Sequence, residues 1–331
     1  MGTLLFNACT HRSVHAFLGR LGVCVAYDTT ITRLRSLGLS AAMNLKALGQ
    51  RFAEKKVTLH FVYDNVNQYA RVWRPSLGAE SLLESGTAGY MIVLPDVDAS
   101  VMNGLEYERR RRELDRDRIT WQRLRSDLDY GHLENVMIGR ILKILLDHVP
   151  YLSQCHSDFL RRFIETKCAK HPVTLRKTEY YALQCSSFDE ATTSGNRDVV
   201  HDFLLRQLGI KEEDVDGRVI GFSGDQLTVS RLRTLSMQTS SGSSWFSRNR
   251  FLLPQIELWH MGAAFQKAIF NCHWSDDVSK GNIGLHYATD RLRRKINPKK
   301  LDYYPADRLL EVTVASLVLH YIRCMLFSLS K

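Results

Sequence analysis

The sequence lacks every short motif that would identify an enzyme class directly. It has no P-loop, no GxGxxG after a predicted strand, no HExxH and no GxSxG. These absences give no support to a phosphate-cradling loop, a dinucleotide-binding fold, a zinc-protease helix or a nucleophile elbow. Any chemistry therefore has to come from residues that are distant in the sequence and that folding brings together.

Paired cysteines are missing as well. The seven cysteines are odd in number, scattered, and free of any CxxC spacing. A disulfide framework and a zinc site with paired ligands are both disfavoured, and a reducing compartment is the simplest account. The N-terminus has no basic leader followed by a long apolar core. We therefore expect an intracellular protein.

An uninterrupted apolar run is missing too. The stretch LLEVTVASLVLHYIRCMLFSLSK at the C-terminus is apolar, but Glu311, His320 and Arg323 interrupt it. We expect a buried helix there instead of a membrane span, and no membrane partner.

What the sequence does have is an ordinary globular composition with an excess of positive charge. Hydrophobic residues make up 44% and charged residues 24%, and the formal net charge is +10. An excess of this sign suits a polyanionic partner such as nucleic acid or an anionic membrane surface. The alternative is a soluble protein that happens to be basic, because a global excess does not show clustering.

Residues 10–50 have helical spacing. The segment LGRLGVCVAYDTTITRLRSLG consists of an apolar helix, a glycine at Gly22 and a second helix from about Thr29. Its arginines Arg33 and Arg35 would face DNA in a helix-turn-helix. A pair of packed helices with an exposed basic edge is the favoured interpretation, because short helix-turn-helix patterns arise easily by chance.

Strand patterns follow in four places. KKVTLHFVYDNVN alternates apolar and polar residues and predicts a strand that ends at Asp64. Further strands are predicted by AGYMIVLPD, VIGFSGD and FLLPQIELWH. The strand in VIGFSGD is followed by Asp225, and the one in FLLPQIELWH ends at His260. Glu257 lies three residues before that histidine.

Asp64 and Asp225 occupy matching positions after apolar strands. Functional groups of α/β proteins gather at the carboxyl ends of strands. Two carboxylates brought together there would repel each other unless a divalent cation neutralised them, and Mg²⁺ or Mn²⁺ accepts such oxygen ligands. For each aspartate alone, a turn or helix-cap role is the competing interpretation. His260 would orient a phosphate, a water or a metal, or would be a core histidine.

Helical patterns occupy most of the remaining chain. Residues 105–130 interleave acids and arginines, as with Glu106 and Arg110, which is typical of a solvated helix with ion pairs. Spacing between 132 and 170 is also helical. MGAAFQKAIFNCHW predicts a helix after the strand that ends at His260, and the set Trp259, Phe265, Phe270 and Trp274 predicts helix-face packing instead of a stacking platform. Arg291 to Lys300 is a basic run without acids.

Three blocks carry a family resemblance. HFVYDNVN, GFSGDQLTVSRLR and LWHMGAAFQKAIFNCHW resemble the hallmark segments of an uncharacterised domain that is abundant, and mobile-element-like, in mushroom-forming fungi. In the order of its elements this domain is similar to DDE transposases with a ribonuclease-H-like core. The segment from Glu257 to His260 is similar to the Cys-x-x-His segment of hAT-type transposases.

The resemblance implies a ribonuclease-H-like mixed sheet flanked by helices. It further implies a helical N-terminal region at 1–54 and a core at 55–331 with a large helical insertion at about 100–195. In such enzymes the first Asp ends the first strand, the second follows the fourth strand, and a third acid lies on a later helix. Asp64 and Asp225 carry over onto the first two positions. For the third, Glu311 is the first choice and Glu257 the second.

The implied function is that of a transposase-like or nuclease-like nuclear protein that acts on DNA. Asp64, Asp225 and Glu311 would hold Mg²⁺ or Mn²⁺, which would activate a water or a 3′-hydroxyl. The alternative is a catalytically inactive nucleic-acid-binding or scaffold protein derived from a mobile element. In either case, the residues expected to contact phosphates are Arg33, Arg35, Arg291, Arg293, Arg294, Lys295, Lys299 and Lys300.

Overall fold

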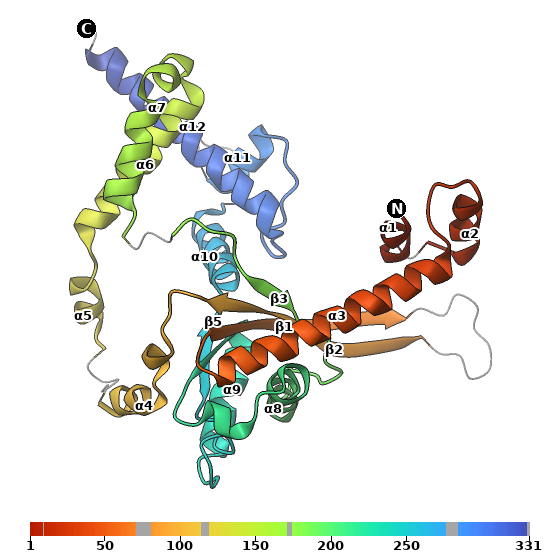
Figure 1. The fold of residues 1–331 in the computed structure, drawn as a ribbon. Coiled ribbons are helices and arrows are strands. Elements are labelled where there is room, and N and C mark those ends of the chain that lie inside the picture. Colours follow the sequence, from red (N-terminus) through yellow and green to blue (C-terminus); the bar gives the residue numbers. More distant parts are fainter. Residues whose placement is uncertain (9, 71–80, 114–118, 171–173, 276–283, 330–331) are drawn as a thin grey trace. The chain divides into compact units, whose positions relative to one another are not determined.

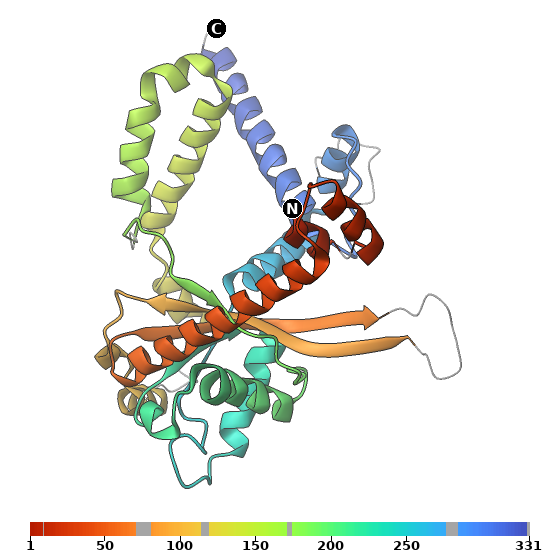
Figure 2. The same cartoon turned by 45° about the vertical axis from the view of Figure 1, so that its right-hand side comes forward.

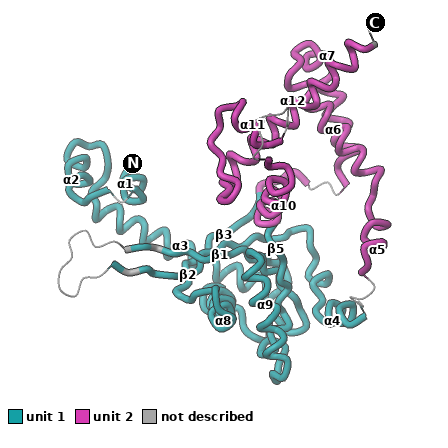
Figure 3. The backbone as a smooth tube through the Cα atoms, turned by 180° about the vertical axis from the view of Figure 1, so that it is seen from behind, with its two compact units in different colours: residues 1–113, 178–257 teal, residues 114–177, 258–331 magenta. Residues whose placement is uncertain are grey.

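The computed structural model describes residues 1–8, 10–70, 81–113, 119–170, 174–275 and 284–329. The chain forms two compact units, each built from two separate stretches of sequence (Figure 3). The first unit comprises Met1–Glu113 and Thr178–Glu257, and the second comprises Leu114–Lys177 and Leu258–Lys331. The helical segment expected at about 100–195 therefore contributes residues to both units.

The first unit contains a five-stranded sheet with the order β3-β2-β1-β4-β5 (Figure 1). β1 runs parallel to β4, and β4 to β5, whereas β2 is antiparallel to both β1 and β3. This mixed sheet, flanked by helices, confirms the predicted α/β class. The strands are β1 (Thr58–Ala70), β2 (Leu82–Leu94), β3 (Tyr180–Ala182), β4 (Ile220–Gly224) and β5 (Leu252–Ile256).

β1 and β2 pair along their whole length, from Thr58 opposite Leu94 to Ala70 opposite Leu82. β4 pairs with β1 at residues 60–62, near the start of β1. Beyond that point β1 and β2 project from the sheet as a two-stranded ribbon (Figure 2). The predicted strand end at Asp64 is therefore wrong, because β2 continues to satisfy the backbone hydrogen bonds of β1 to residue 70.

The core of the first unit lies between the sheet and its helices. Period-two alternation buries Leu59, Phe61 and Tyr63 of β1. The Phe61 ring stacks on Phe222 of β4, with 4.8 Å between centroids, and on Phe203, with 6.3 Å. Buried residues of the helices complete the same cluster. These helices are α3 (Tyr27–Ala53), α8 (Thr193–His201), the π-helical turn η4 (Asp202–Leu208) and α9 (Gln226–Gln238).

Shorter elements complete the first unit. They are α1 (Gly2–Asn7), α2 (Arg12–Arg20), the 3-10 turns η1 (Ala99–Met102) and η5 (Glu212–Val215), and α4 (Gly104–Glu113). α4 has the predicted ion pair between Glu106 and Arg110 at 2.7 Å, and Glu106 also bonds to Arg109 at 2.7 Å. Glu108 instead points inward, 8% exposed, and pairs with Arg250 at 2.6 Å.

The two N-terminal helices expected around Gly22 are present. α2 ends at Arg20, Gly22 has a φ of +72° and α3 begins at Tyr27. The left-handed backbone conformation at this point favours glycine, because glycine has no Cβ atom to clash with the backbone. Arg33 and Arg35 lie exposed on α3.

Helices are the regular elements of the second unit, and its described residues include no strand. It has a hydrophobic core cluster of its own, formed by buried Phe270, Leu285, Ala306 and Leu309, with Trp274 packed against them. The elements are α5 (Trp121–Ser126), α6 (Tyr130–His148), α7 (Pro150–Phe163), the π-helical turn η3 (Ile164–Cys168), α10 (Leu258–His273), α11 (Leu285–Arg291) and α12 (Tyr303–Leu329).

α12 departs from the buried helix that its apolar sequence predicts. Ala306, Leu309 and Ala315 are buried. Of the most apolar 18-residue stretch of the helix, however, only 6% is buried. By length and composition alone, Tyr303–Ser328 could cross a membrane. The physical reason for the difference is that α6, α10 and α11 pack against parts of this long helix and leave the rest exposed.

Candidate functional site

Three acidic residues lie near the carboxyl ends of the pairing between neighbouring parallel strands: Asp64 inside β1, Asp225 directly after β4 and Glu257 directly after β5. Val62 of β1 pairs with Ser223 of β4, so the same register continued by two residues places Asp64 opposite Asp225. Gly224 pairs with Ile256 of β5, so Glu257 falls opposite Asp225 on the other side. Neighbouring strands are about 4.8 Å apart. The sheet therefore brings the two sequence-predicted aspartates onto adjacent strands.

Asp225 begins α9 as its N-cap. Its Oδ1 accepts a hydrogen bond of 2.7 Å from the Thr228 backbone N–H, so the helix-cap interpretation of this residue is correct. The preceding Gly224 makes the tight entry feasible, because a Cβ there would lie 2.7 Å from the Thr228 side chain. The backbone carbonyl of Gly224 accepts from the N–H of Glu257 at 3.0 Å.

Asp64 is exposed on β1, just past the end of the β1–β4 pairing. Its Oδ1 accepts from the backbone N–H of Asn65 at 2.9 Å. The side-chain oxygen of Asn65 is buried without a hydrogen-bond partner. An orphaned buried oxygen beside an exposed carboxylate is a costly arrangement and is a potential ligand for a cation or a water.

A further acid, Glu190, lies next to this pair. It belongs to the connection between β3 and α8, and it is only 5% exposed. The pKa of Glu190 is raised to about 7, chiefly by burial, and the negative charges of Asp64 and Asp225 contribute to the rise. Hydrogen bonds from the Thr228 hydroxyl and the Asn65 backbone oppose that rise. Glu190 therefore interacts electrostatically with both predicted aspartates.

A buried network holds the Glu190 connection in place. The Tyr63 hydroxyl donates to Asn196 Oδ1 at 2.7 Å, and the Asn196 amide donates to the backbone carbonyl of Glu190. Burial raises the pKa of Tyr63 well above its usual range, and the charges of Glu190 and Asp225 add to the shift. Tyr63 therefore stays a neutral hydrogen-bond donor beside the acids.

The acids do not form a ready-made metal site. Among the residues that the structure describes, no group of three or more His, Cys, Asp or Glu side chains is arranged to hold a metal ion. The donors themselves, three carboxylates and an orphaned amide oxygen, are of the kind that Mg²⁺ and Mn²⁺ prefer. The chemistry of the donor set fits a divalent ion, and binding would require its side chains to turn.

The other two predicted residues of the acid site belong to the second unit. Glu311 lies on α12 and is paired with Arg140 at 3.4 Å and with Arg308 at 3.1 Å. Hydrogen bonding to Arg308, then to Arg140, lowers the pKa of Glu311. The prediction that His260 ends a strand is wrong. β5 stops at Ile256, and His260 lies in the first turn of α10.

The predicted phosphate contacts fall in both units. Arg33 and Arg35 are on α3 of the first unit, and the basic run follows α11 in the second. Arg291 closes α11, where its guanidinium lies over the Tyr287 ring at 5.1 Å. The remaining members are exposed in the connection to α12: Arg293, Arg294, Lys295, Lys299 and Lys300.

Sequence reasoning missed Glu190. Its neighbours FDEATTSGN form a polar segment without strand or helix periodicity, so no local pattern distinguishes Glu190 from Asp189. The nearest signal is Thr192, whose hydroxyl caps α8 through the N–H of Gly195 at 2.9 Å. A cap predicts where α8 starts but does not indicate which preceding acid is buried.

Comparison with known proteins gives a family match and little more. The model of a family described as of unknown function, DUF6589, matches residues 109–330. That range contains Glu190 and Asp225 and leaves out Asp64. No curated protein and no solved structure matches the chain.

Proposed function

The chain belongs to DUF6589, a family of unknown function, and we propose that it is a transposase-like or nuclease-like protein. In this proposal it acts on DNA through phosphodiester chemistry that depends on a divalent metal, Mg²⁺ or Mn²⁺. The observation that carries the proposal is the convergence of Asp64, Asp225 and Glu190 at one edge of the sheet. Burial and the negative charges of Asp64 and Asp225 raise the pKa of Glu190, a costly arrangement that a bound cation would relieve.

We propose a ribonuclease-H-like architecture for the first unit. The supporting features are that the first aspartate lies on the first strand and the second directly after the fourth. The two strands are neighbours although β2 and β3 intervene in the sequence. Likeness of layout alone would not carry a function, which is why the proposal depends on the acids.

Glu190 is our choice for the third acid. Its charge interacts with those of both aspartates within the same unit. Glu257 lies at the same end of the sheet, but the charges that shift the pKa values of Glu190 and Tyr63 are those of other acids. Glu311 already has two arginine partners.

A bound divalent ion would polarise the scissile phosphate and lower the pKa of an attacking water. The chain's own groups would hold that ion. Glu190 would exchange the Thr228 hydroxyl for the metal, and Asp64 would offer the oxygen that now accepts from Asn65. Asp225 keeps one oxygen on the helix cap and has the other for the ion.

Nicking of supercoiled plasmid DNA by the full chain, with Mg²⁺ or Mn²⁺, tests the proposal. We expect Asp64→Asn, Asp225→Asn and Glu190→Gln each to reduce the rate by about 100-fold or more, because each removes a charge that the metal needs. Asn still caps a helix, so the Asp225 variant keeps the fold of α9. Glu213→Gln, an exposed acid of the same unit, is the matched control.

Glu311→Gln decides between the candidates for the third acid. We expect it to retain wild-type nicking, since Glu311 forms an exposed ion pair. Full activity of the Glu190 variant together with loss in the Glu311 variant would reverse the assignment. Nicking that survives both aspartate substitutions would end the metal-nuclease proposal.

The alternative is a catalytically inactive nucleic-acid-binding or scaffold protein. One observation favours it: no described group of three acids is positioned to hold a metal as it stands. Under this alternative the purified chain binds DNA and shows no nicking with either metal. The same plasmid assay, combined with a binding measurement, therefore separates the two functions.

DNA as partner and the nucleus as location remain part of the proposal. The net charge of +10 and the exposed basic residues on α3 and after α11 support a polyanionic partner. Binding through phosphates releases counterions, so affinity should fall steeply with salt.

A further inference from the structure

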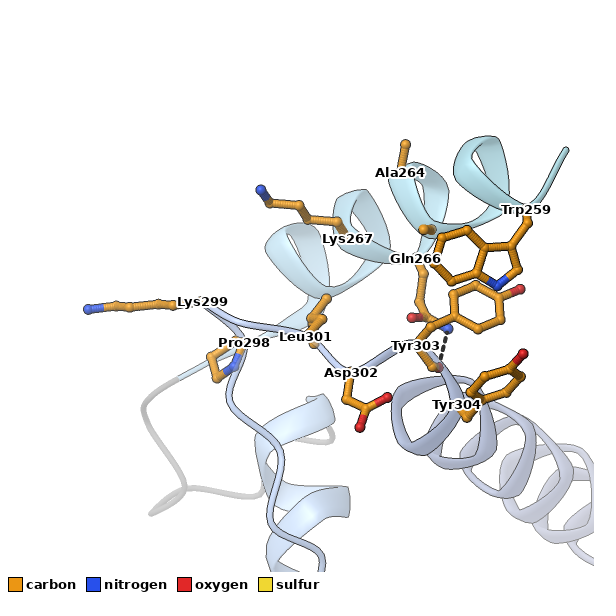
Figure 4. Close-up of a pocket in the computed structure, with 11 residues that line it drawn as sticks. Trp259, Ala264, Gln266, Lys267, Pro298, Lys299, Leu301, Asp302, Tyr303 and Tyr304 are labelled. Carbon is orange, nitrogen blue, oxygen red and sulfur yellow. Dashed lines mark hydrogen bonds between the residues drawn. The ribbon is translucent and has the colours of Figure 1, made fainter. Parts of the chain in front are cut away.

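The second unit contains an open cavity of about 520 Å³ between α10 and the start of α12. This size is typical of small-ligand sites, which span about 300–1,000 Å³. Figure 4 shows that its aromatic side chains gather at one end and its lysines reach out at the other. The aromatic and charged residues that line it are Trp259, Lys267, Lys299, Asp302, Tyr303 and Tyr304.

The aromatic end presents ring surface to the cavity. Trp259 and Tyr303 have centroids 5.3 Å apart, and Tyr304 meets Tyr303 edge-on at 5.4 Å. Trp259 is 45% exposed and Tyr304 is 72% exposed. The packing role expected for Trp259 is therefore only partly correct, whereas Phe270 of the same helix is fully buried. Exposed ring surface beside a cavity can stack on a planar ligand.

Contacts between α10 and Tyr303 of α12 hold the two walls of the cavity together. The Gln266 amide, buried to 5% exposure, donates to the backbone carbonyl of Tyr303 at 3.2 Å. The Tyr303 hydroxyl also approaches Gly262, where a Cβ would lie 3.3 Å from it. α10 and the start of α12 are thus joined by a buried hydrogen bond and by contact of the Tyr303 side chain with α10 at Gly262.

The other end of the cavity is positively charged. Lys267 on α10 and Lys299 before α12 both line it and are exposed, and Asp302 is its one acid. Lys299 belongs to the basic run from Arg291 to Lys300, which leads directly into the cavity wall. A ligand that extends beyond the cavity would therefore meet further positive charge.

We propose that this cavity binds an unpaired base of single-stranded DNA. The base stacks on Trp259 and Tyr304, and the flanking phosphates contact Lys267 and Lys299. Stacking platforms combined with a basic track are the usual means of holding single strands, because every base has a π-face. Asp302 can accept a hydrogen bond from an N–H group on the edge of a base, such as N3–H of thymine. In a duplex the bases are stacked on one another, so their faces are unavailable to these rings.

This inference shares the DNA partner with the proposed function but concerns a different unit and needs no metal. Its test is therefore carried out in EDTA, where metal-dependent cleavage cannot occur. Fluorescence anisotropy of a labelled oligothymidylate of about 12 nucleotides measures binding by the full chain. An abasic sugar-phosphate chain and a duplex of equal length serve as comparison ligands.

Trp259→Ala and Tyr304→Ala should each weaken oligothymidylate binding by about 5- to 100-fold, the range of base–aromatic stacking. Binding of the abasic chain should not change. Trp259→Phe should restore most of the affinity because it keeps a ring. Lys299→Gln should instead make the negative slope of log K against log salt shallower by about 0.7, the value for one phosphate on a single strand.

Phe265→Ala is the matched control, since Phe265 is on the same helix, 64% exposed and outside the cavity lining. Lys167→Gln serves in the same way for charge. Thermal melts followed by circular dichroism identify any variant that fails to fold. Tyr304 is the more exposed of the two rings, so its variant tests the site even if the Trp259 variant is unstable.

Undiminished binding in folded Trp259→Ala and Tyr304→Ala would overturn the inference. Equal loss in Phe265→Ala, or equal loss of duplex binding, would overturn it as well, because neither depends on base stacking in this cavity. A chain that nicks DNA but fails this test loses only the cavity proposal. A chain that passes it but never nicks loses only the metal-dependent function.

Discussion

The hydroxyl of Thr228 donates a hydrogen bond of 3.1 Å to Oε2 of Glu190. The backbone N–H of the same Thr228 donates to Asp225 at 2.7 Å. One residue in the first turn of α9 therefore joins the buried acid to the helix-capping acid. Because the Glu190 carboxylate is buried beside other negative charges, this hydroxyl is one of the few groups that stabilise its ionised form.

Replacing Thr228 by Val should raise the pKa of Glu190 above about 7, since it removes the hydroxyl and leaves a methyl group of similar size. At about pH 8 the free energy of unfolding should fall by about 1–3 kcal/mol, the cost of a lost hydrogen bond to a buried charged group. Urea unfolding across a pH series measures both effects. Thr228→Ser keeps the hydroxyl, so its pH profile should match that of the wild type even if its stability is slightly lower. A Val variant with the wild-type profile would contradict the assigned hydrogen bond.

Glu190 should make the protein less stable as pH rises. Its pKa is about 7 in the folded chain and about 4.5 in the unfolded chain, so the folded state binds more protons between these values. The free energy of unfolding contributed by this group is highest below about pH 4.5 and is lost as pH rises through about 7. The total change is on the order of 3 kcal/mol.

Glu190→Gln tests this linkage, because glutamine has no proton to lose. The variant's free energy of unfolding should change less than that of the wild type between about pH 4.5 and pH 8. Metal-free buffer is essential, since a bound cation would lower the pKa of Glu190. Parallel stability curves for the two proteins would show that this pKa is close to its usual value.

A divalent cation should stabilise the folded chain at high pH and much less at low pH. Below about pH 7 Glu190 keeps its proton and the site offers one charge fewer. At a metal concentration 100 times Kd, the stabilisation would be about 2.7 kcal/mol, seen as a higher Tm by calorimetry. Asp64→Asn should remove most of the shift, whereas KCl at equal ionic strength should not produce it. A shift of equal size at about pH 5 and pH 8 would argue for a metal site elsewhere.

Tyr63→Phe should destabilise the first unit by about 1–3 kcal/mol. It removes the buried hydroxyl that donates to Asn196 at 2.7 Å and leaves that acceptor unsatisfied. Chemical denaturation measures the loss. Tyr69→Phe, on the same strand but 62% exposed, should have almost no effect. Equal stabilities of the two variants would mean that the Tyr63 hydrogen bond contributes little.

The sequence was sufficient wherever local periodicity carried the information. Alternation at Leu59, Phe61 and Tyr63 predicted β1, and the glycine and apolar patterns predicted β4 and the helix pair around Gly22. The predicted end of β1 failed because pairing with β2, which extends the strand to Ala70, is a property of two strands. His260 was misplaced for a similar reason, since the register of β5 with β4 ends at Ile256.

By itself, the sequence determined the α/β class and placed Asp64 and Asp225 after apolar strand patterns, because both follow from residue spacing within short segments. Only the tertiary structure decided that β1 and β4 are neighbours, with their pairing ending two residues before the aspartates, and that Glu190 is buried and interacts with both charges. Burial and charge interaction depend on neighbours that are distant along the chain, such as Thr228 for Glu190. Spacing within one segment carries no information about them.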